Sequence, residues 1–435
     1  MKKRITFILI ILIVTATTFY QPIVRAGTLY DSYKGPMGIE IKSYSSNWTG
    51  NKLKDIYTEL LNNTYGGEIE YLSTINLYPN NPFGGEEEGL YHGAFISKSF
   101  LNKTDYKMKK NRVIDLFNMD KKYNISDIAK TLSHEYGHHF TLYYLLKGEN
   151  KSFDQWRDTK YAKIRGLVDD SRVKHDYSNG HQWNITEIAA EDYVQLFGSP
   201  NSKMPTFYDD IVARAKKQEL DGVIKWSNHI YNVYPQENFY LPLANDVPGL
   251  GEYWFSVSNI KIKNKSPIKG SVVSLTEVID LGHGKKQFVI RWTEDKGSKD
   301  LLYTLVAYDE EQQQVIPVKT VEQGEELVAI IGSTKITNGN EIIYYSDTFT
   351  DQRKSMRVYT MNKDGIMVSS NIMEIDFNNP KITKLPPTIN QNSIISEGNR
   401  IDGELPITEA KEISIKKGWL DSIFDFIIGL IEKFF

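Results

Sequence analysis

From Ile39 to about Tyr234, hydrophobic patterns typical of helices and of strands alternate along the chain. Within residues 51–62, apolar side chains recur with the 3.6-residue period of an amphipathic helix. A favourable N-cap, Ser126, predicts a long helix that ends at Gly148. Runs of apolar residues predict further strands and helices: strands at Ile39–Ile41, Glu68–Leu77, Leu90–Ser97 and Arg112–Asn118, and helices at Ile185–Phe197 and Pro205–Lys217.

Beyond residue 255 the pattern changes to short strand-like runs separated by turn residues. The runs are Phe288–Trp292, Leu301–Ala307, Val315–Val321, Leu327–Ile331, Glu341–Tyr345, Met356–Thr360 and Ile366–Ile375. Such a series is typical of an antiparallel β-sandwich. The sequence therefore predicts an α+β domain over residues 27–243 and an all-β sandwich over 256–378. We expect a linker at 244–255, which contains Pro and Gly, and a polar linker at 379–418.

The chain ends in a segment, Trp419–Phe435, that predicts a strongly amphipathic helix. Its non-hydrophobic positions fall within an arc of about 120° at the helical period. We expect this helix to dock on its own protein, to drive self-association or to contact a membrane. Its polar face is poor in Lys and Arg, unlike that of most membrane-surface helices.

The N-terminus has the three-part pattern of a secretory signal peptide. A basic head at residues 2–4 precedes the apolar run Phe7–Val14, and Val24-Arg25-Ala26 offers small residues for cleavage after Ala26. An uncleaved membrane anchor is the alternative, but the apolar stretch is shorter than the roughly 20 residues that a span requires. We therefore expect residues 1–26 to be a signal peptide and the protein to be secreted by a bacterium.

Composition narrows the possible chemistry. The 435 residues carry a formal net charge of -3, which gives no electrostatic signature for nucleic acid binding. The chain contains 0 cysteines, which excludes disulfides, cysteine nucleophiles and thiolate metal sites. Any metal ion must therefore be held by nitrogen and oxygen ligands.

The strongest chemical motif is His134-Glu135-Tyr136-Gly137-His138, which lies within the long predicted helix. Its i, i+4 spacing places two imidazoles on one helical face, where they can share one Zn²⁺. Glu135 lies about 100° further round the helix, where it can serve as general base toward a water activated by the metal. His139 follows the motif but points away from this face, and we expect it to be a bystander or a supporting residue.

A zinc hydrolase needs a third protein ligand. Glu187 and Glu191 lie one helical turn apart in Ile185–Phe197, where Ala189 and Ala190 allow close packing against the first helix. We expect Glu187 to bind the metal and Glu191 to accept a hydrogen bond from a ligand histidine, although the reverse order is also possible. A histidine as third ligand would require the short metzincin spacing, which this chain lacks.

At these residues the chain resembles the gluzincin metallopeptidases, and most closely their anthrax lethal factor-like branch, in which a Glu-x-x-Ala-Glu helix follows the first motif. The resemblance covers roughly residues 126–199 and implies a zincin-like fold. It also implies one zinc ion held by His134, His138 and Glu187, with Glu135 as base and Glu191 in support. The thermolysin-type Asn-Glu-x-x-Ser-Asp helix is absent.

The resemblance also implies an oxyanion-stabilising tyrosine shortly before the third ligand. The corresponding position in this chain is close to Gly180, and Tyr177 and His181 on either side are the candidates. A separate, loose resemblance to fibronectin type III domains, through Trp292 and the run Arg357–Gly365, covers only the predicted sandwich.

Together these features predict a secreted zinc endopeptidase in which Glu135 deprotonates a zinc-bound water that attacks a protein or peptide substrate. The alternative is a surface or toxin-like binding protein with a structural zinc and a β-sandwich recognition module. In this fold class the strand before the metal helix, here Arg112–Asn118, commonly pairs with the substrate. The acidic run 86–88 is expected to be a solvated loop or an attractant for cations or a basic peptide.

Overall fold

The structure is a computed structural model of the whole chain, and its described residues belong to one compact unit that ends at Pro386. The predicted signal peptide, the helix at 205–217, nearly all of the polar linker and the C-terminal helix lie outside the described residues. No helix within the described part is long and apolar enough to cross a membrane. The described ranges are 27–85, 87–100, 103–203, 237–260, 268–310, 314–338, 341–346, 353–362 and 365–385.

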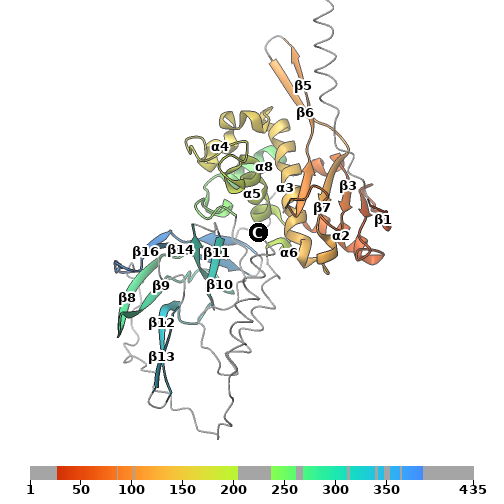
Figure 1. Cartoon of the computed structure of the whole chain (residues 1–435). Helices are drawn as coiled ribbons and strands as arrows, with labels where there is room; N and C mark the ends of the chain where they lie inside the picture. Colours follow the sequence, from red (N-terminus) through yellow and green to blue (C-terminus); the bar gives the residue numbers. More distant parts are fainter. Residues whose placement is uncertain are drawn as a thin grey trace, which may run out of the picture. The chain divides into compact units, whose positions relative to one another are not determined.

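The first sheet has five strands in the order β1-β2-β3-β7-β4, of which β1, β3 and β7 are labelled in Figure 1. The inner strands β2, β3 and β7 run parallel, whereas β1 and β4 are antiparallel to their neighbours. Their bounds are β1 Asp31–Lys34, β2 Glu40–Ser43, β3 Leu72–Leu77, β7 Arg112–Leu116 and β4 Gly89–His92. The expected pairing of substrate with Arg112–Asn118 is therefore wrong, because β3 and β4 occupy both sides of β7.

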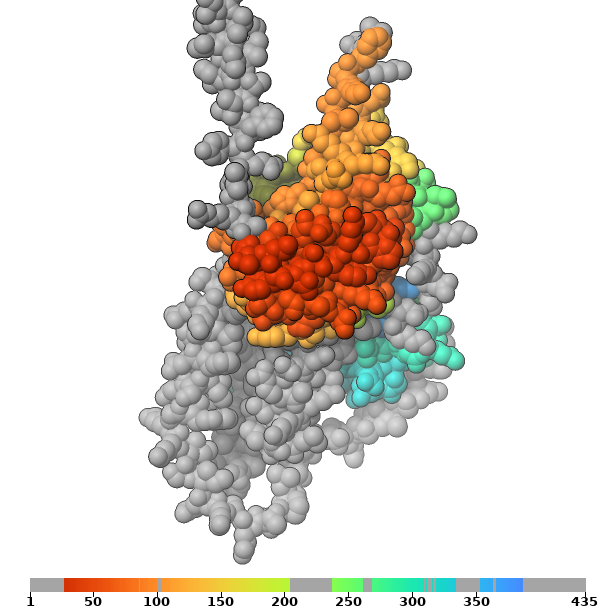
Figure 2. Space-filling model, turned by 90° about the vertical axis from the view of Figure 1, so that its right-hand side faces the viewer, coloured from red at the N-terminus to blue at the C-terminus, as the bar shows by residue number. Residues whose placement is uncertain are grey.

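Two predicted strands are interrupted. Glu68–Leu77 begins as a 3₁₀ turn over Gly67–Tyr71, because the Glu68 carboxylate accepts hydrogen bonds from the Gly66 N–H and holds the chain in a turn. Leu90–Ser97 divides at Gly93 into β4 and a separate hairpin of β5 (Phe95–Phe100) and β6 (Lys103–Met108). In Figures 1 and 2 this hairpin projects beyond the surface formed by the first sheet.

Helices cover the first sheet and contribute to its core. The helices α2 and α5 have the bounds that their hydrophobic periods predict, and α3 extends one residue beyond the predicted end. Ser126 is the first residue of α3 and not its N-cap, because Asp127 instead accepts hydrogen bonds from the Tyr123 and Asn124 N–H groups before the helix. The bounds are α2 Asn51–Asn62, α3 Ser126–Glu149, α4 Lys160–Arg165, α5 Ile185–Phe197, α6 Pro200–Lys203 and α8 Leu250–Ser258.

The segment expected to be a linker, 244–255, is instead part of the first core. Its second half begins α8, and Leu250, Tyr253 and Trp254 are buried in the core, where Trp254 packs against Phe140 of α3 and Tyr161 of α4. Its Pro and Gly residues interrupt regular secondary structure, but its apolar side chains gain more free energy from burial in the core than they would have in solvent. The first domain therefore continues to about residue 260.

The remainder of the described chain is all β, as its turn-punctuated pattern predicts, so the protein is of mixed α+β class. One sheet has the order β11-β10-β14-β15, with β16 also on β14, and the other has the order β13-β12-β9-β8. Residues from both sheets form one hydrophobic cluster around Trp292, Tyr303 and Ile331. The strands are β8 Val273–Gly282, β9 Lys285–Trp292, β10 Leu301–Asp309, β11 Gln314–Glu322, β12 Val328–Asn338, β13 Glu341–Ser346, β14 Arg353–Asn362, β15 Met367–Ser369 and β16 Met373–Asp376.

Candidate metal centre

The centre lies where α3 and α5 pack together closely. A Cβ atom at Gly137 would lie 2.8 Å from the carbonyl oxygen of Ala190, so the two backbones approach as only a glycine allows. The small residues Ala189 and Ala190 are both buried at this contact, as the sequence predicts. This contact brings the histidines of α3 within reach of the glutamates of α5.

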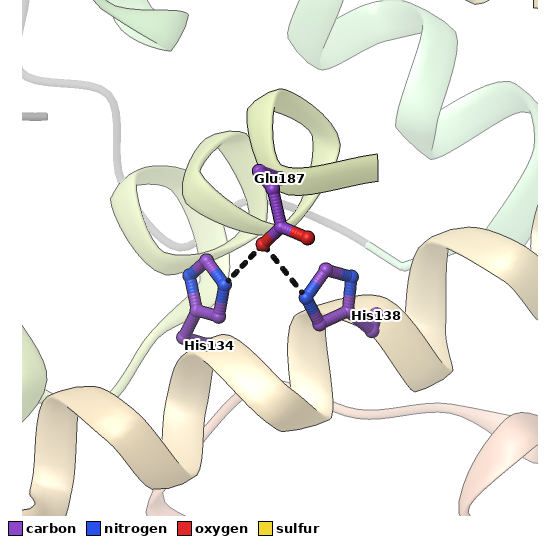
Figure 3. Close-up of side chains that lie close together, drawn as sticks. All are labelled: His134, His138 and Glu187. Atoms are coloured by element: carbon purple, nitrogen blue, oxygen red, sulfur yellow. Dashed lines mark hydrogen bonds and ion pairs between the residues drawn. The ribbon is translucent and has the colours of Figure 1, made fainter. Parts of the chain in front are cut away.

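Three of the predicted site residues converge at one point (Figure 3). The Oε2 atom of Glu187 lies 3.0 Å from Nε2 of His134 and 3.1 Å from Nε2 of His138. All three ligand atoms lie within 4.8 Å of one another, which is close enough for one metal ion to bind them all. The two histidines occupy one face of α3, and Glu187 points at them from the first turn of α5.

Glu191 supports the same histidine from its other side. Its Oε1 atom lies 3.0 Å from Nδ1 of His134 and 3.4 Å from the ammonium of Lys130. If Nδ1 of His134 donates to Glu191, the lone pair of Nε2 is directed at the common point beside Glu187. The structure thus places Glu187, not Glu191, beside both histidines.

The charges at this point favour a bound cation. Three carboxylates, those of Glu135, Glu187 and Glu191, are buried, and Lys130 pairs with one of them. Burial by itself would raise the pKa of Glu187 and of Glu191. The neighbouring histidines nevertheless hold the pKa of Glu187 well below its ordinary value, and Lys130 and His134 lower the pKa of Glu191 to about 2. A donor set of two imidazoles and a carboxylate fits a divalent metal ion, whose positive charge would take the place of the protons that the histidines share with these carboxylates.

Glu135 faces the edge strand β4 and not Glu187. A Cβ atom at Gly89 would lie 2.7 Å from Oε1 of Glu135, and the Tyr91 backbone N–H donates a hydrogen bond to the Glu135 carboxylate. Burial raises the pKa of Glu135, and the two adjacent histidines lower it in part. Glu135 therefore lies between the metal-ligand face of α3 and β4, the edge strand of the first sheet.

Tyr177 and His181, the two candidates before α5, both lie beside Glu187. The Tyr177 hydroxyl donates to Oε1 of Glu187 at 3.0 Å, and Nε2 of His181 lies 3.4 Å from Oε2. The two rings stack with their centroids 5.5 Å apart. Burial of the Tyr177 hydroxyl raises its pKa, and the carboxylates of Glu187, Glu135 and Glu87 raise it further.

Sequence reasoning missed Glu237, which holds His181 in place. Nδ1 of His181 lies 2.9 Å from both carboxylate oxygens of Glu237. Burial alone would lower the pKa of His181, but Glu237 and Glu187 raise it above its ordinary value. Glu237 is 56 positions from His181, and no motif or local period connects the two.

His139 has a structural role on the face of α3 that also carries Glu135 and contacts β4. It is fully buried, its Nδ1 lies 2.9 Å from the Tyr91 hydroxyl, and its Nε2 lies 2.8 Å from the Glu68 carbonyl oxygen. A neutral imidazole satisfies both contacts, with Nε2 donating to the carbonyl and Nδ1 accepting from the hydroxyl. His139 therefore joins α3 to β4 and is a bystander to the metal site, as expected.

Comparisons with known proteins leave the function open. No protein-family model and no curated protein matches the chain. Among solved structures, the chain is similar to the glycoside hydrolase domain of Endo-D from Streptococcus pneumoniae R6, at 10% identity over 28% of this chain and 17% of that chain. With a TM-score of 0.19, this likeness carries no argument about fold or activity.

Proposed function

We propose that this chain is a secreted zinc endopeptidase of the gluzincin type, with a zincin-like domain followed by a β-sandwich. The observation that carries the proposal is the convergence of His134, His138 and Glu187 beside a buried Glu135. Two imidazoles and one carboxylate, with a position left for water, are the ligand set of catalytic zinc sites. A purely structural zinc would need no glutamate in the position of Glu135.

His134, His138 and Glu187 would hold the zinc ion. When bound, zinc acts as a Lewis acid that lowers the pKa of a water molecule and polarises a carbonyl group. The Glu135 carboxylate accepts the proton of the attacking water and returns it to the leaving amine. Tyr177 and His181, next to Glu187, would donate hydrogen bonds to the developing oxyanion.

The edge strand β4 supports a polypeptide substrate. In the described part of the chain only β7 pairs with β4, so an extended peptide would add to the other edge of Gly89–His92. There it would replace two contacts of Tyr91, whose N–H donates to the Glu135 carboxylate and whose carbonyl accepts from the Gly93 N–H. Since Gly89 lies against Glu135, a peptide on this edge would pass over the metal-ligand face of α3. Such pairing recognises the peptide backbone and is compatible with many side chains.

The decisive experiment compares the full chain with its Glu135→Gln variant on an unfolded protein substrate, with zinc measured in both. We expect wild type to cleave and the variant to bind zinc but to lose cleavage by several orders of magnitude. Glu374→Gln, an exposed substitution on β16, is the matched control. Cleavage that survives in Glu135→Gln would disprove the mechanism, and a zinc-loaded wild type that cleaves no protein would favour the binding-protein alternative.

Secretion rests on the N-terminal pattern alone and has its own test. We propose that export removes residues 1–26, so the secreted form should begin at Gly27. N-terminal sequencing of protein recovered from the medium of an expressing bacterium measures this directly. A secreted form that still begins at Met1 would contradict cleavage after Ala26.

A further inference from the structure

The strand β4 and the helix α3 run side by side in the same direction. A Cβ atom at Gly89 would contact Thr131 and Glu135, the Tyr91 hydroxyl contacts His139, and a Cβ atom at Gly93 would lie 3.2 Å from Leu142. The two ends of β4 therefore lie on opposite sides of the metal centre along the path of an edge-bound peptide. Each end continues into a surface of different charge.

The surface before β4 is acidic. Glu87 and Glu88 directly precede Gly89, and both are exposed. Glu88 is paired with Lys122 at 2.8 Å, whereas the Glu87 carboxylate accepts a hydrogen bond from the neutral amide of Asn81. Glu87 is close enough to the Tyr177 hydroxyl to act on it electrostatically. This end of the path therefore presents a negative charge close to the reacting atoms.

The surface after β4 is basic and partly apolar. In the β5–β6 hairpin, cross-strand partners share a face, so Ile96, Lys98 and Lys107 project from one face and Phe95 and Met108 from the other. Met108 is buried, whereas Ile96, Lys98 and Lys107 are exposed. Lys98 has Asp105 opposite it, and exposed lysines at 109 and 110 follow the hairpin.

Exposed apolar side chains accompany these lysines. Phe100, near the end of the hairpin, is 77% exposed, and Ile96 on the same face is 39% exposed. Exposed apolar area combined with lysines is typical of a surface that contacts another molecule. The hairpin projects from the rest of the first domain (Figures 1 and 2), and it follows β4 directly in the chain.

We propose that the substrate is a polypeptide segment whose two ends carry opposite charges, with acidic and apolar residues before the scissile bond and a basic residue shortly after it. The proposal rests on the proposed peptidase function. An antiparallel peptide, the more stable arrangement at a sheet edge, has its N-terminal part beside the hairpin and its C-terminal part beside Glu87. Lys98 is 9 positions beyond Gly89, so the acidic residues should lie roughly seven to nine positions before the scissile bond if the pairing continues along β5.

The test uses three fluorogenic peptides that share one core around the scissile bond. The acidic-first peptide has acidic residues before the bond and a basic residue after it, the basic-first peptide has the charges exchanged, and the neutral peptide has no charged residues at these positions. We expect kcat/KM of the zinc-loaded full chain to fall in the order acidic-first, neutral, basic-first, with about tenfold between the extremes at low salt. This ratio should shrink as ionic strength rises. In the same order, the Kd measured by fluorescence anisotropy with Glu135→Gln, which reports binding without turnover, is expected to rise.

The double substitution Lys98→Glu, Lys107→Glu should reverse the preference between the acidic-first and neutral peptides. Lys299→Glu, an exposed site in the β-rich region, is the matched control and should keep it. Equal rates on all three peptides, a preference for basic-first, or a preference that survives the double substitution would overturn the inference while the peptidase function stands. Failure to cleave even the neutral peptide would count against the peptidase function instead.

A membrane is the other partner that a basic, apolar hairpin could contact. Sedimentation with phosphatidylserine vesicles separates the two possibilities. Vesicle binding that the Lys98→Glu, Lys107→Glu variant loses, together with an unchanged peptide preference, would overturn the substrate assignment.

Discussion

Gly137 on α3 lies directly against Ala190 on α5, so closely that a methyl group at 137 would reach to 2.8 Å from the Ala190 carbonyl oxygen. The obstacle is backbone and not a flexible side chain, so the helices would have to separate. We therefore expect Gly137→Ala to destabilise the fold by about 1–3 kcal/mol, although alanine is intrinsically the better helix former.

The same substitution should weaken metal binding, because it moves Glu187 away from His134 and His138. Denaturant unfolding and zinc competition with a chelator measure the two effects. Gly67→Ala is the control, since a Cβ atom there has nothing within 4 Å. A stabilised Gly137→Ala protein would show that helix propensity outweighs the close contact.

Glu187 and Glu191 should differ in their effect on metal affinity. Glu187 reaches both histidines through one oxygen, whereas Glu191 contacts Nδ1 of His134. We expect Glu187→Gln to abolish tight zinc binding and Glu191→Gln to weaken it by about 10–100-fold. A larger loss in Glu191→Gln would show that the ligand order is reversed.

Gly89→Ala should impair catalysis and leave the metal in place. Its new Cβ would lie 2.7 Å from Oε1 of Glu135, so the carboxylate must turn away from its position beside the metal ligands. We expect kcat to fall by about 100-fold, because a displacement of a catalytic group by about 1 Å has an effect of this size. The zinc content should be unchanged. Loss of zinc in this variant would mean that β4 holds the metal ligands and not only the base.

His139 should make stability depend on pH. Burial lowers its pKa from 6.5 to about 4. The unfolded chain therefore binds more protons between these values, and the stability contributed by neutral His139 is complete above pH 6.5 and lost as the pH falls to about 4. Between pH 7 and 4.5, wild type should lose about 2–3 kcal/mol more unfolding free energy than His139→Gln. Parallel pH profiles in denaturant unfolding would contradict this.

Local patterns predicted the helices better than the connections. The bounds of α2 and α5 follow from hydrophobic periods within each segment. The segment 244–255 was misjudged because Pro and Gly indicate a break, whereas the burial of Trp254 depends on residues of α3 far away in the chain. The expected pairing of substrate with Arg112–Asn118 is wrong for a similar reason, since strand order depends on pairing between distant segments.

The amino-acid sequence by itself determined that His134 and His138 share one face of a helix, that Glu187 and Glu191 share a face of another, and that no thiol competes with them. These follow from helical spacing and composition, which are local properties. Only the tertiary structure decided that Glu187 lies between the histidines, that Glu135 faces β4 and that Glu237 holds His181. Those relationships depend on how closely α3, α5 and the sheet pack, and close packing is set by contacts between residues that are distant in the chain.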